Sequence, residues 1–199
     1  EGMTMKVLIT GCRGQLGLEL IRQFNEFDGL YSLIETDVHN LDITNQAMVF
    51  DLVKSQKPDV IINCAAYTNV DGCESDELNA YRVNAIGPQN LSAAAFSVGA
   101  KIVQVSTDYV FDGTVSSPKI ESDPINPRSV YGKSKALGEI LVKEINPRHF
   151  IVRTAWLYGE GNNFVRTMLK LAKEKDEVKV VNDQFGSPTS TKDLARCII

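Results

Sequence analysis

MKVLITGCRGQLG, residues 5–17, decides the fold of this chain. It begins with an apolar run from Val7 to Ile9, turns through Gly11, Gly14 and Gly17, and continues as an amphipathic helical pattern. A buried strand that feeds a glycine turn at the start of a helix is the phosphate-binding unit of dinucleotide-binding folds. The turn lets backbone approach a pyrophosphate, and the helix N-terminus supplies free N–H groups. The stretch therefore predicts a dinucleotide site, although glycines at this spacing also occur in plain turns.

Strand-like and helix-like segments alternate along the rest of the chain. Apolar runs predict strands at residues 6–10, 31–36, 60–64, 102–106, 150–153 and 178–181. Amphipathic stretches predict helices at residues 14–27, 45–55, 75–98, 130–145 and 163–173. This alternation predicts an α/β fold, a Rossmann-like doubly wound parallel sheet with helices on both faces. Residues 112–128 predict a long functional loop. Residues 192–199 read as the start of a helix, so we expect the polypeptide to continue.

The charge, the apolar runs and the cysteines of the chain bear on which kinds of partner it can bind. The 199 residues carry a net charge of −4 without a basic cluster, which argues against nucleic acid as a partner. The longest apolar runs, such as 60–62, are too short to cross a bilayer, so we expect no membrane partner. The four cysteines form no CxxC pair. They read as reduced thiols of a cytoplasmic protein, and we predict no metal site.

Two acidic positions and one arginine bear on the choice of cofactor. Asp37 follows the second predicted strand, where an acidic residue commonly bonds the ribose hydroxyl of NAD and would repel a 2′-phosphate. Arg13, inside the glycine turn, favours the opposite choice because a guanidinium there could bind that phosphate. The residues therefore leave NADP and NAD both open. Asp42 and Ile43 could hold an adenine edge, or Asp42 could cap the helix after Thr44.

The ends of the third and fourth predicted strands carry further candidates. Ala65, Ala66 and Tyr67 follow the third strand, and small residues at that edge of a parallel sheet leave room for a ligand. The next residues, up to Asp71, bring polar groups to the mouth of the same site. The fourth strand ends at Thr107, whose hydroxyl could reach a reacting carbonyl. The alternative is a threonine that simply suits a strand.

Tyr131 and Lys135 form the most specific chemical pair. In a helix they are four residues apart and lie on one face. A free phenol has a pKa of about 10. A nearby ammonium favours the phenolate and lowers that pKa, which makes the pair a proton donor with an electrostatic partner. The alternative is an exposed helical pair, a common surface feature.

These motifs resemble a known group of enzymes. Thr10-Gly11-x-x-Gly14-x-x-Gly17, Asn63-x-Ala65-Ala66, Asn84-x-x-Gly87, Thr107 and Tyr131-x-x-x-Lys135 are similar to the extended short-chain dehydrogenase/reductase superfamily. Longer strings resemble the dTDP-4-dehydrorhamnose reductase family over nearly the whole chain: STDYVFDG at 106–113, VYGK at 130–133, RTAWLY at 153–158, GNNF at 161–164 and NDQFGSPT at 182–189.

The resemblance implies a reaction and a role for each matched residue. It implies reduction of the 4-keto group of dTDP-4-dehydro-L-rhamnose, with NADPH and often also NADH as cofactor. The implied catalytic residues are Thr107, Tyr131 and Lys135, with Tyr131 as the proton donor. The implied cofactor-binding residues are Gly11, Arg13, Gly14, Gln15, Leu16, Gly17, Asp37, Asp42, Ile43, Ala65, Ala66, Tyr67, Tyr131 and Lys135. The implied residues facing the dTDP-sugar are Val70, Asp71, Thr107, Asp108 and Trp156.

The resemblance also implies a division of the chain and leaves alternatives. Residues 1–157 would form the NADP(H)-binding Rossmann domain. Residues 158–199 would begin a small substrate-binding lobe, interleaved with the last Rossmann elements and incomplete at the C-terminus, so we expect cofactor binding with low or no turnover. Some members form a homodimer through magnesium, for which Glu19 is an unsupported ligand candidate. Asp108-Tyr109 lacks the Asp-Glu pair of sugar dehydratases. Another nucleotide-sugar epimerase or reductase, and a non-catalytic NADP-binding regulatory subunit, remain as alternatives.

Overall fold

A five-stranded parallel sheet forms the centre of the molecule. The structure, a computed structural model, describes residues 4–199. The strands are β1 (Met5–Thr10), β2 (Tyr31–Glu35), β3 (Val60–Asn63), β4 (Lys101–Thr107) and β5 (His149–Thr154), in the order β2-β1-β3-β4-β5. All four pairings are parallel, which confirms the predicted fold class. The chain reverses its direction of winding between β1 and β3, and ligands of such sheets bind at that point, outside the carboxyl ends of the strands.

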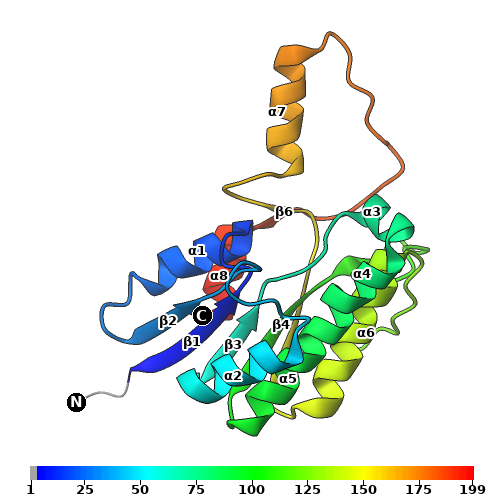
Figure 1. Cartoon of the computed structure of the whole chain (residues 1–199). Coiled ribbons are helices and arrows are strands. Elements are labelled where there is room, and N and C mark those ends of the chain that lie inside the picture. Colours follow the sequence, from blue (N-terminus) through cyan, green and yellow to red (C-terminus); the bar gives the residue numbers. More distant parts are fainter. Residues whose placement is uncertain (1–3) are drawn as a thin grey trace.

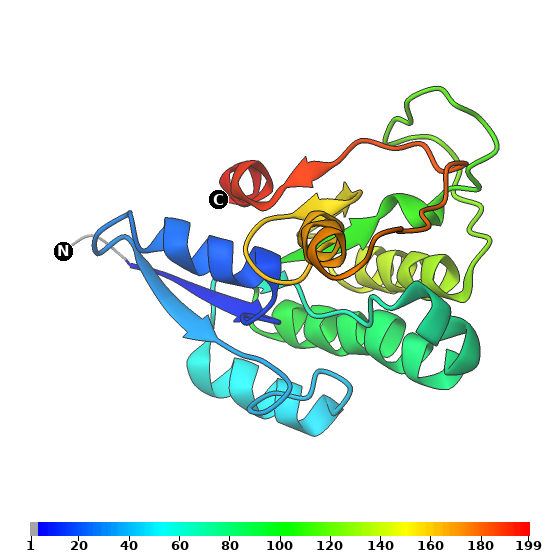
Figure 2. The ribbon, with the colours of Figure 1, turned by 90° about the horizontal axis from the view of Figure 1, so that it is seen from above.

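Helices cover both faces of the sheet. On one face lie α1 (Gln15–Phe24) and α8 (Thr191–Ile198), and on the other α2 (Gln46–Gln56), α5 (Gly87–Ser97) and α6 (Val130–Ile145) (Figure 1). Figure 2 shows the three layers from above. Successive strand residues serve opposite faces: Leu8 packs in the core under α2 and α5, whereas Val7 and Ile9 pack under α1 and α8. This explains why the strands read as continuous apolar runs, since both of their faces are buried.

Short polar side chains begin most of the long helices. Asn45 accepts a hydrogen bond from the backbone N–H of Met48 at the start of α2, and Ser129 accepts one from Gly132 at the start of α6. Such caps satisfy N–H groups that have no partner inside the helix. Helix α1 differs because its N-cap is Gly14, which has no side chain for this purpose. The first N–H groups of α1 are therefore available to a ligand.

The helix predicted at 75–98 is confirmed over most of its length, although it is not a regular α-helix throughout. The chain is helical from residue 77 to residue 97, as α4 (Glu77–Tyr81), the π-helix η1 (Arg82–Ile86) and then α5. A separate short helix, α3 (Val70–Ser75), precedes it. Asp76, with a φ of −134°, separates α3 from α4. The π-helical turn holds Asn84, whose amide bonds the backbone N–H and C=O of Tyr67 and the hydroxyl of Ser134. These long-range bonds have no local signal, so helical periodicity does not predict the π-helical turn.

The predicted strand at 178–181 is wrong. These residues form no strand and are exposed or half-buried, since no described strand pairs with them. An apolar run becomes a strand only where a neighbour satisfies its backbone groups. Instead β6 (Leu157–Tyr158) pairs in parallel with β7 (Thr189–Ser190). Between them α7 (Phe164–Glu174) stands away from the sheet and buries none of its residues, whereas α8 lies beside α1 (Figure 1).

Candidate active site

A cavity of about 850 Å³ opens at the carboxyl ends of the central strands. It is lined by the glycine turn, by the residues that follow β2 and β3, by the end of β4, by the first turns of α6 and by the residues that follow β5. All the residues predicted for the site line this cavity except Tyr67 and Asp71. The structure therefore brings together side chains that lie more than a hundred residues apart in the sequence.

The glycine turn packs directly against the end of β3. Gly11 has a φ of +62°, and a Cβ atom there would lie 2.8 Å from the backbone nitrogen of Ala65. A Cβ atom on Gly17 would lie 2.7 Å from the Cα of Cys12 and would also strike the Gly11 carbonyl oxygen. Larger residues would push the helix off the strand. The turn thus brings bare backbone and the free start of α1 to the cavity.

Asp37 and Arg13 meet at the mouth of the cavity. The Asp37 carboxylate accepts hydrogen bonds from the backbone N–H of Arg13 (3.1 Å) and of Val38 (2.8 Å). The Arg13 side chain itself is exposed. Asp42 accepts two bonds from Thr44, one from its backbone N–H and one from its hydroxyl, and so stabilises the turn before α2. Asp37 therefore helps to position the glycine turn, and it also lines the cavity.

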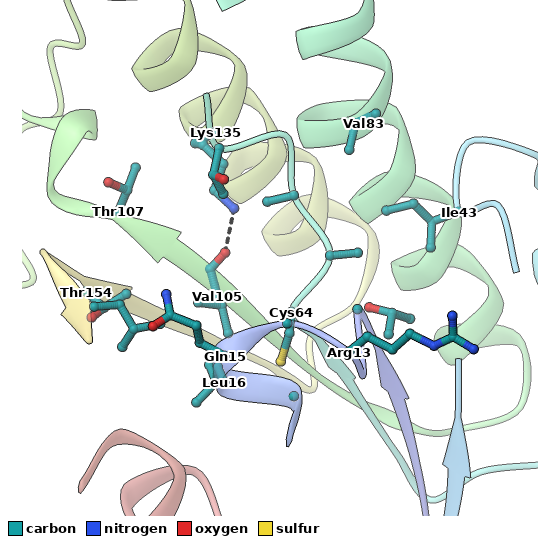
Figure 3. Close-up of a pocket in the computed structure, with 18 of the residues that line it drawn as sticks. Arg13, Gln15, Leu16, Ile43, Cys64, Val83, Val105, Thr107, Lys135 and Thr154 are labelled. Carbon is teal, nitrogen blue, oxygen red and sulfur yellow. Dashed lines mark hydrogen bonds between the residues drawn. The ribbon is translucent and has the colours of Figure 1, made fainter. Parts of the chain in front are cut away.

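Thr107, Tyr131 and Lys135 lie at the other end of the cavity. All three are buried, with 5%, 9% and 4% of their surface exposed. The Thr107 hydroxyl donates to the carboxylate of Asp108 (3.1 Å), and the Lys135 ammonium donates to the backbone oxygen of Val105 (2.7 Å). Figure 3 shows Lys135 and Thr107 at the upper left, Gln15 and Leu16 below them, and Arg13 and Ile43 at the right.

Burial sets the ionisation of this end of the site. It raises the pKa of Tyr131 to about 12, an effect that the Thr107 hydroxyl partly opposes. It lowers the pKa of Lys135 to about 8, and the charge of Glu139 works in the opposite direction. Burial also raises the pKa of the Asp108 carboxyl. We expected Lys135 to lower the pKa of Tyr131, but in this structure desolvation raises it, and the charge of Asp108 adds to the rise, so the phenol is held protonated.

Only some of the residues predicted to face the sugar line the cavity. Val70, Asp108 and Trp156 line the cavity. Trp156 has a φ of +46°, a strained conformation for a residue with a side chain, and its indole is half exposed. Asp71 is exposed in the first turn of α3, outside the cavity. Tyr67 also lies outside its lining, with its backbone held by Asn84.

Thr154 is a lining residue that the sequence did not single out. It ends β5 directly beside Thr107 in the register of the sheet, and Figure 3 shows it opposite Lys135. Its buried hydroxyl oxygen has no hydrogen-bond partner among residues 4–199. A buried polar atom without a partner is unusual and points to a ligand or water as its partner. The RTAWLY string at 153–158 contains it, but no spacing rule marks a hydroxyl at a strand end.

Within residues 4–199 there is neither a cluster of metal-binding side chains nor a helix that could span a membrane. No group of three or more His, Cys, Asp or Glu side chains is arranged to hold a metal ion in that range. No helix of the same range combines the length and the apolar character needed to cross a membrane.

Known proteins match the chain along most of its length. The family model described as RmlD substrate binding domain matches residues 5–199. A dTDP-4-dehydrorhamnose reductase from Aggregatibacter actinomycetemcomitans is 50% identical over 195 residues, which cover 98% of this chain and 66% of that protein. The chain thus spans about two thirds of the length of curated relatives such as this one.

Solved structures agree with this match. The crystal structure of a dTDP-4-dehydrorhamnose reductase from Clostridium acetobutylicum is 58% identical, with a TM-score of 0.94 over 98% of this chain and 69% of that one. A dTDP-4-dehydrorhamnose reductase from Bacillus anthracis, solved in complex with NADP, is 47% identical, with a TM-score of 0.94 over 100% of this chain and 70% of that one. The chain therefore belongs to the RmlD substrate binding domain family, together with the dTDP-4-dehydrorhamnose reductases that it matches.

Proposed function

We propose that this chain carries the catalytic site of an NADPH-dependent reductase that converts dTDP-4-dehydro-L-rhamnose to dTDP-L-rhamnose. One observation carries the proposal: a single cavity joins the glycine turn to Thr107, Tyr131 and Lys135. The relatives with this name and the NADP complex of the Bacillus anthracis protein support the same assignment.

The residues around the cavity suit a bound dinucleotide. Backbone takes the space that a Cβ atom would fill at Gly11 and Gly17, so these glycines let the turn pack tightly against β3, and the free start of α1 then faces the cavity where a pyrophosphate would bind. Arg13 is free to meet a 2′-phosphate, and Asp37 is placed to accept a ribose hydroxyl. The unpartnered hydroxyl of Thr154 provides one more polar contact inside the cavity. Bound NADPH would supply the hydride for the reduction.

The protein's part in the reaction is to bind, orient and protonate the ketone. The Thr107 hydroxyl, at the end of β4, would hydrogen-bond the carbonyl oxygen and polarise it. Tyr131 would give its phenolic proton to that oxygen as the C4–H bond forms, which leaves an alcohol on the sugar and a phenolate on the enzyme. The buried Lys135 ammonium would stabilise that phenolate. A tyrosine whose pKa lies near 12 is protonated at neutral pH and holds the proton that this step needs.

The sugar would lie at the open side of the same cavity. Val70, Asp108 and the half-exposed indole of Trp156 would contact it. Asp108 is followed by Tyr109, so the site lacks the acid pair that a dehydratase would need. We further propose that the protein acts in the cytoplasm, where its four free cysteines stay reduced, and that it can act as a homodimer.

The test is NADPH oxidation with dTDP-4-dehydro-L-rhamnose. It uses the 199-residue chain and a version extended over the remaining third of the relatives' length, each first shown to bind NADPH. We expect one NADPH to be consumed for each sugar reduced by the extended protein, with lower turnover in the shorter chain. An epimerase would consume no net NADPH. A regulatory subunit would bind NADPH and leave the sugar unchanged, and either result would overturn the proposal.

A further inference from the structure

Glu139 is a buried charge that the proposed reaction does not use. It lies on α6 with none of its surface exposed. Tyr131, Lys135 and Glu139 are spaced four residues apart, so they follow one another along the same face of the helix. A charge in such a place needs partners, because burial alone would cost more than the fold can easily offset.

Arg153 of β5 is the main partner of Glu139. Its Nε and Nη2 donate to the two carboxylate oxygens of Glu139 at 2.8 and 2.6 Å, a two-pronged contact. The Lys143 ammonium, on the exposed side of α6, lies farther away at 3.7 Å. A planar guanidinium that meets a carboxylate in this way fixes orientation as well as distance. The pair therefore ties α6 to β5 at one defined position.

The same guanidinium also touches the segment that follows β4. It lies 5.1 Å from the centre of the Phe111 ring, and Phe111 ends the short helix η2 (Asp108–Val110) that begins at Thr107. In the sheet, Arg153 pairs with Ser106, the residue before Thr107. Arg153 thus contacts or adjoins each of the segments that carry Thr107, Tyr131 and Lys135.

We propose that Glu139 is a positioning residue for the proton-donating pair: through Arg153 it holds α6 against the Thr107 segment, and its negative charge keeps the buried Lys135 in its ammonium form. The claim that Glu139 aligns α6 with the Thr107 segment rests on the proposed function, because the alignment matters only if Thr107 and Tyr131 act on a substrate. The claim that Glu139 keeps Lys135 charged does not depend on that function, and the charge of Lys135 can be measured without substrate.

The charges around Lys135 support this role. Burial lowers the Lys135 pKa, Glu139 raises it, and the Cys64 thiol is the other titratable group that faces Lys135. The Glu139 pKa lies below its usual value, although burial alone would raise it, because Arg153 and Lys143 favour the carboxylate. Glu139 is therefore ionised at neutral pH, and its negative charge raises the pKa of Lys135.

The first test is an NMR titration of Lys135 in the cofactor-free chain, assigned by its loss in Lys135→Met. We expect a midpoint near pH 8 in the unchanged protein. Glu139→Gln keeps the shape but removes the charge, and should lower the midpoint by about one unit. Glu139→Asp should restore it, and Lys143→Met, the matched control, should not lower it. An unchanged midpoint in a folded Glu139→Gln protein would overturn the proposal.

A second variant covers the case in which Glu139→Gln does not fold. Arg153→Lys keeps both charges but loses the two-pronged contact. In the extended protein it should leave the Lys135 midpoint unchanged and lower kcat about tenfold with little change in the KM for NADPH, since only alignment is lost. An unchanged kcat would overturn the positioning role. If the unchanged protein bound NADPH but reduced no sugar, the proposed function would fail while the titration result would stand.

Discussion

At the scale of single residues, burial decides what each group in the site can do. Tyr131 and Lys135 were predicted as a pair in which the ammonium lowers the phenol pKa. The structure places both in the interior, where desolvation favours the neutral form of each group. It therefore raises the pKa of Tyr131 and lowers the pKa of Lys135. The phenol thereby keeps its proton, and the ammonium depends on Glu139 to stay charged.

Tyr131→Phe should separate chemistry from binding. The phenylalanine keeps the edge-to-face contact with Tyr109, whose ring centre lies 5.4 Å away, but it has no proton to give. We expect turnover of the extended protein to fall roughly 10²- to 10⁴-fold, with NADPH affinity nearly unchanged. Steady-state kinetics and fluorescence titration measure the two quantities. Tyr109→Phe is the control, and a Tyr131→Phe protein that retained more than about a tenth of the turnover would contradict the role.

Arg13 and Asp37 should set the preference between NADPH and NADH. Removing the exposed guanidinium in Arg13→Met should weaken NADPH binding about tenfold and leave NADH binding almost unchanged, because only NADPH carries the 2′-phosphate. Fluorescence titrations with both cofactors measure this difference. Asp37→Asn removes the charge that repels the phosphate and should shift the preference toward NADPH. Equal losses for both cofactors in Arg13→Met would show that Arg13 does not contact the phosphate.

At the scale of elements, close backbone contacts hold the site together. A Cβ atom on Gly132, in the first turn of α6, would strike the backbone oxygen of Tyr109 and lie 3.1 Å from the side chain of Pro127. Ser129 caps the same turn, and the Glu74 carboxylate accepts from the backbone N–H of Val130. The start of α6 is therefore fixed by η2 and α3 as well as by its own sequence.

Gly132→Ala tests this contact. Alanine is the better helix former, so helix propensity alone predicts a stabilisation of about 1 kcal/mol. The clash with the Tyr109 carbonyl should reverse the sign and lower the free energy of unfolding by about 2 kcal/mol. Urea denaturation of the chain measures it. The control is Lys133→Ala, one residue away and exposed, which should change stability by less than about 0.5 kcal/mol. A stabilised Gly132→Ala protein would refute the contact.

At the scale of the whole molecule, stability comes from the sheet and the helices packed on it. Leu91 of α5 is fully buried in the core under α2, whereas Leu169 of α7 is 61% exposed. Leu91→Ala should cost about 3 kcal/mol and Leu169→Ala less than about 0.5 kcal/mol, although the deleted atoms are the same. Urea denaturation of both variants gives the comparison. Similar losses would mean that α7 packs against the sheet in solution.

Acid should weaken the link between α6 and β5. The pKa of the buried Glu139 is lower in the folded protein than its usual 4.5. Its stabilisation is therefore complete above that value and is lost as the pH falls through the folded pKa. Glu139→Gln should lower the free energy of unfolding by about 3 kcal/mol at pH 7, because Arg153 loses its partner. The difference between the two proteins in urea should shrink below about pH 4, and a constant difference would contradict the ionised pair.

Local patterns predicted the parts of the site that depend on local geometry. The glycine turn and the four-residue spacing of Tyr131 and Lys135 are read directly from neighbouring positions, and both lie at the cavity as expected. The strand predicted at 178–181 was wrong, and the helix predicted at 75–98 contains a π-helical turn that was not expected. Their outcome depends on a missing neighbouring strand and on the bonds of Asn84 to Tyr67 and Ser134, which no local pattern reports.

By itself, the sequence determined the α/β class, the glycine turn between the first strand and the first helix, and the four-residue spacing of Tyr131 and Lys135, because these follow from periodicity and from residue types at short spacing. Only the tertiary structure decided that Thr154 lies beside Thr107 without a partner, that Arg153 joins Glu139 to Phe111, and that burial reverses the expected shift of the Tyr131 pKa. These features depend on desolvation and on contacts between distant segments, which exist only once the sheet has formed.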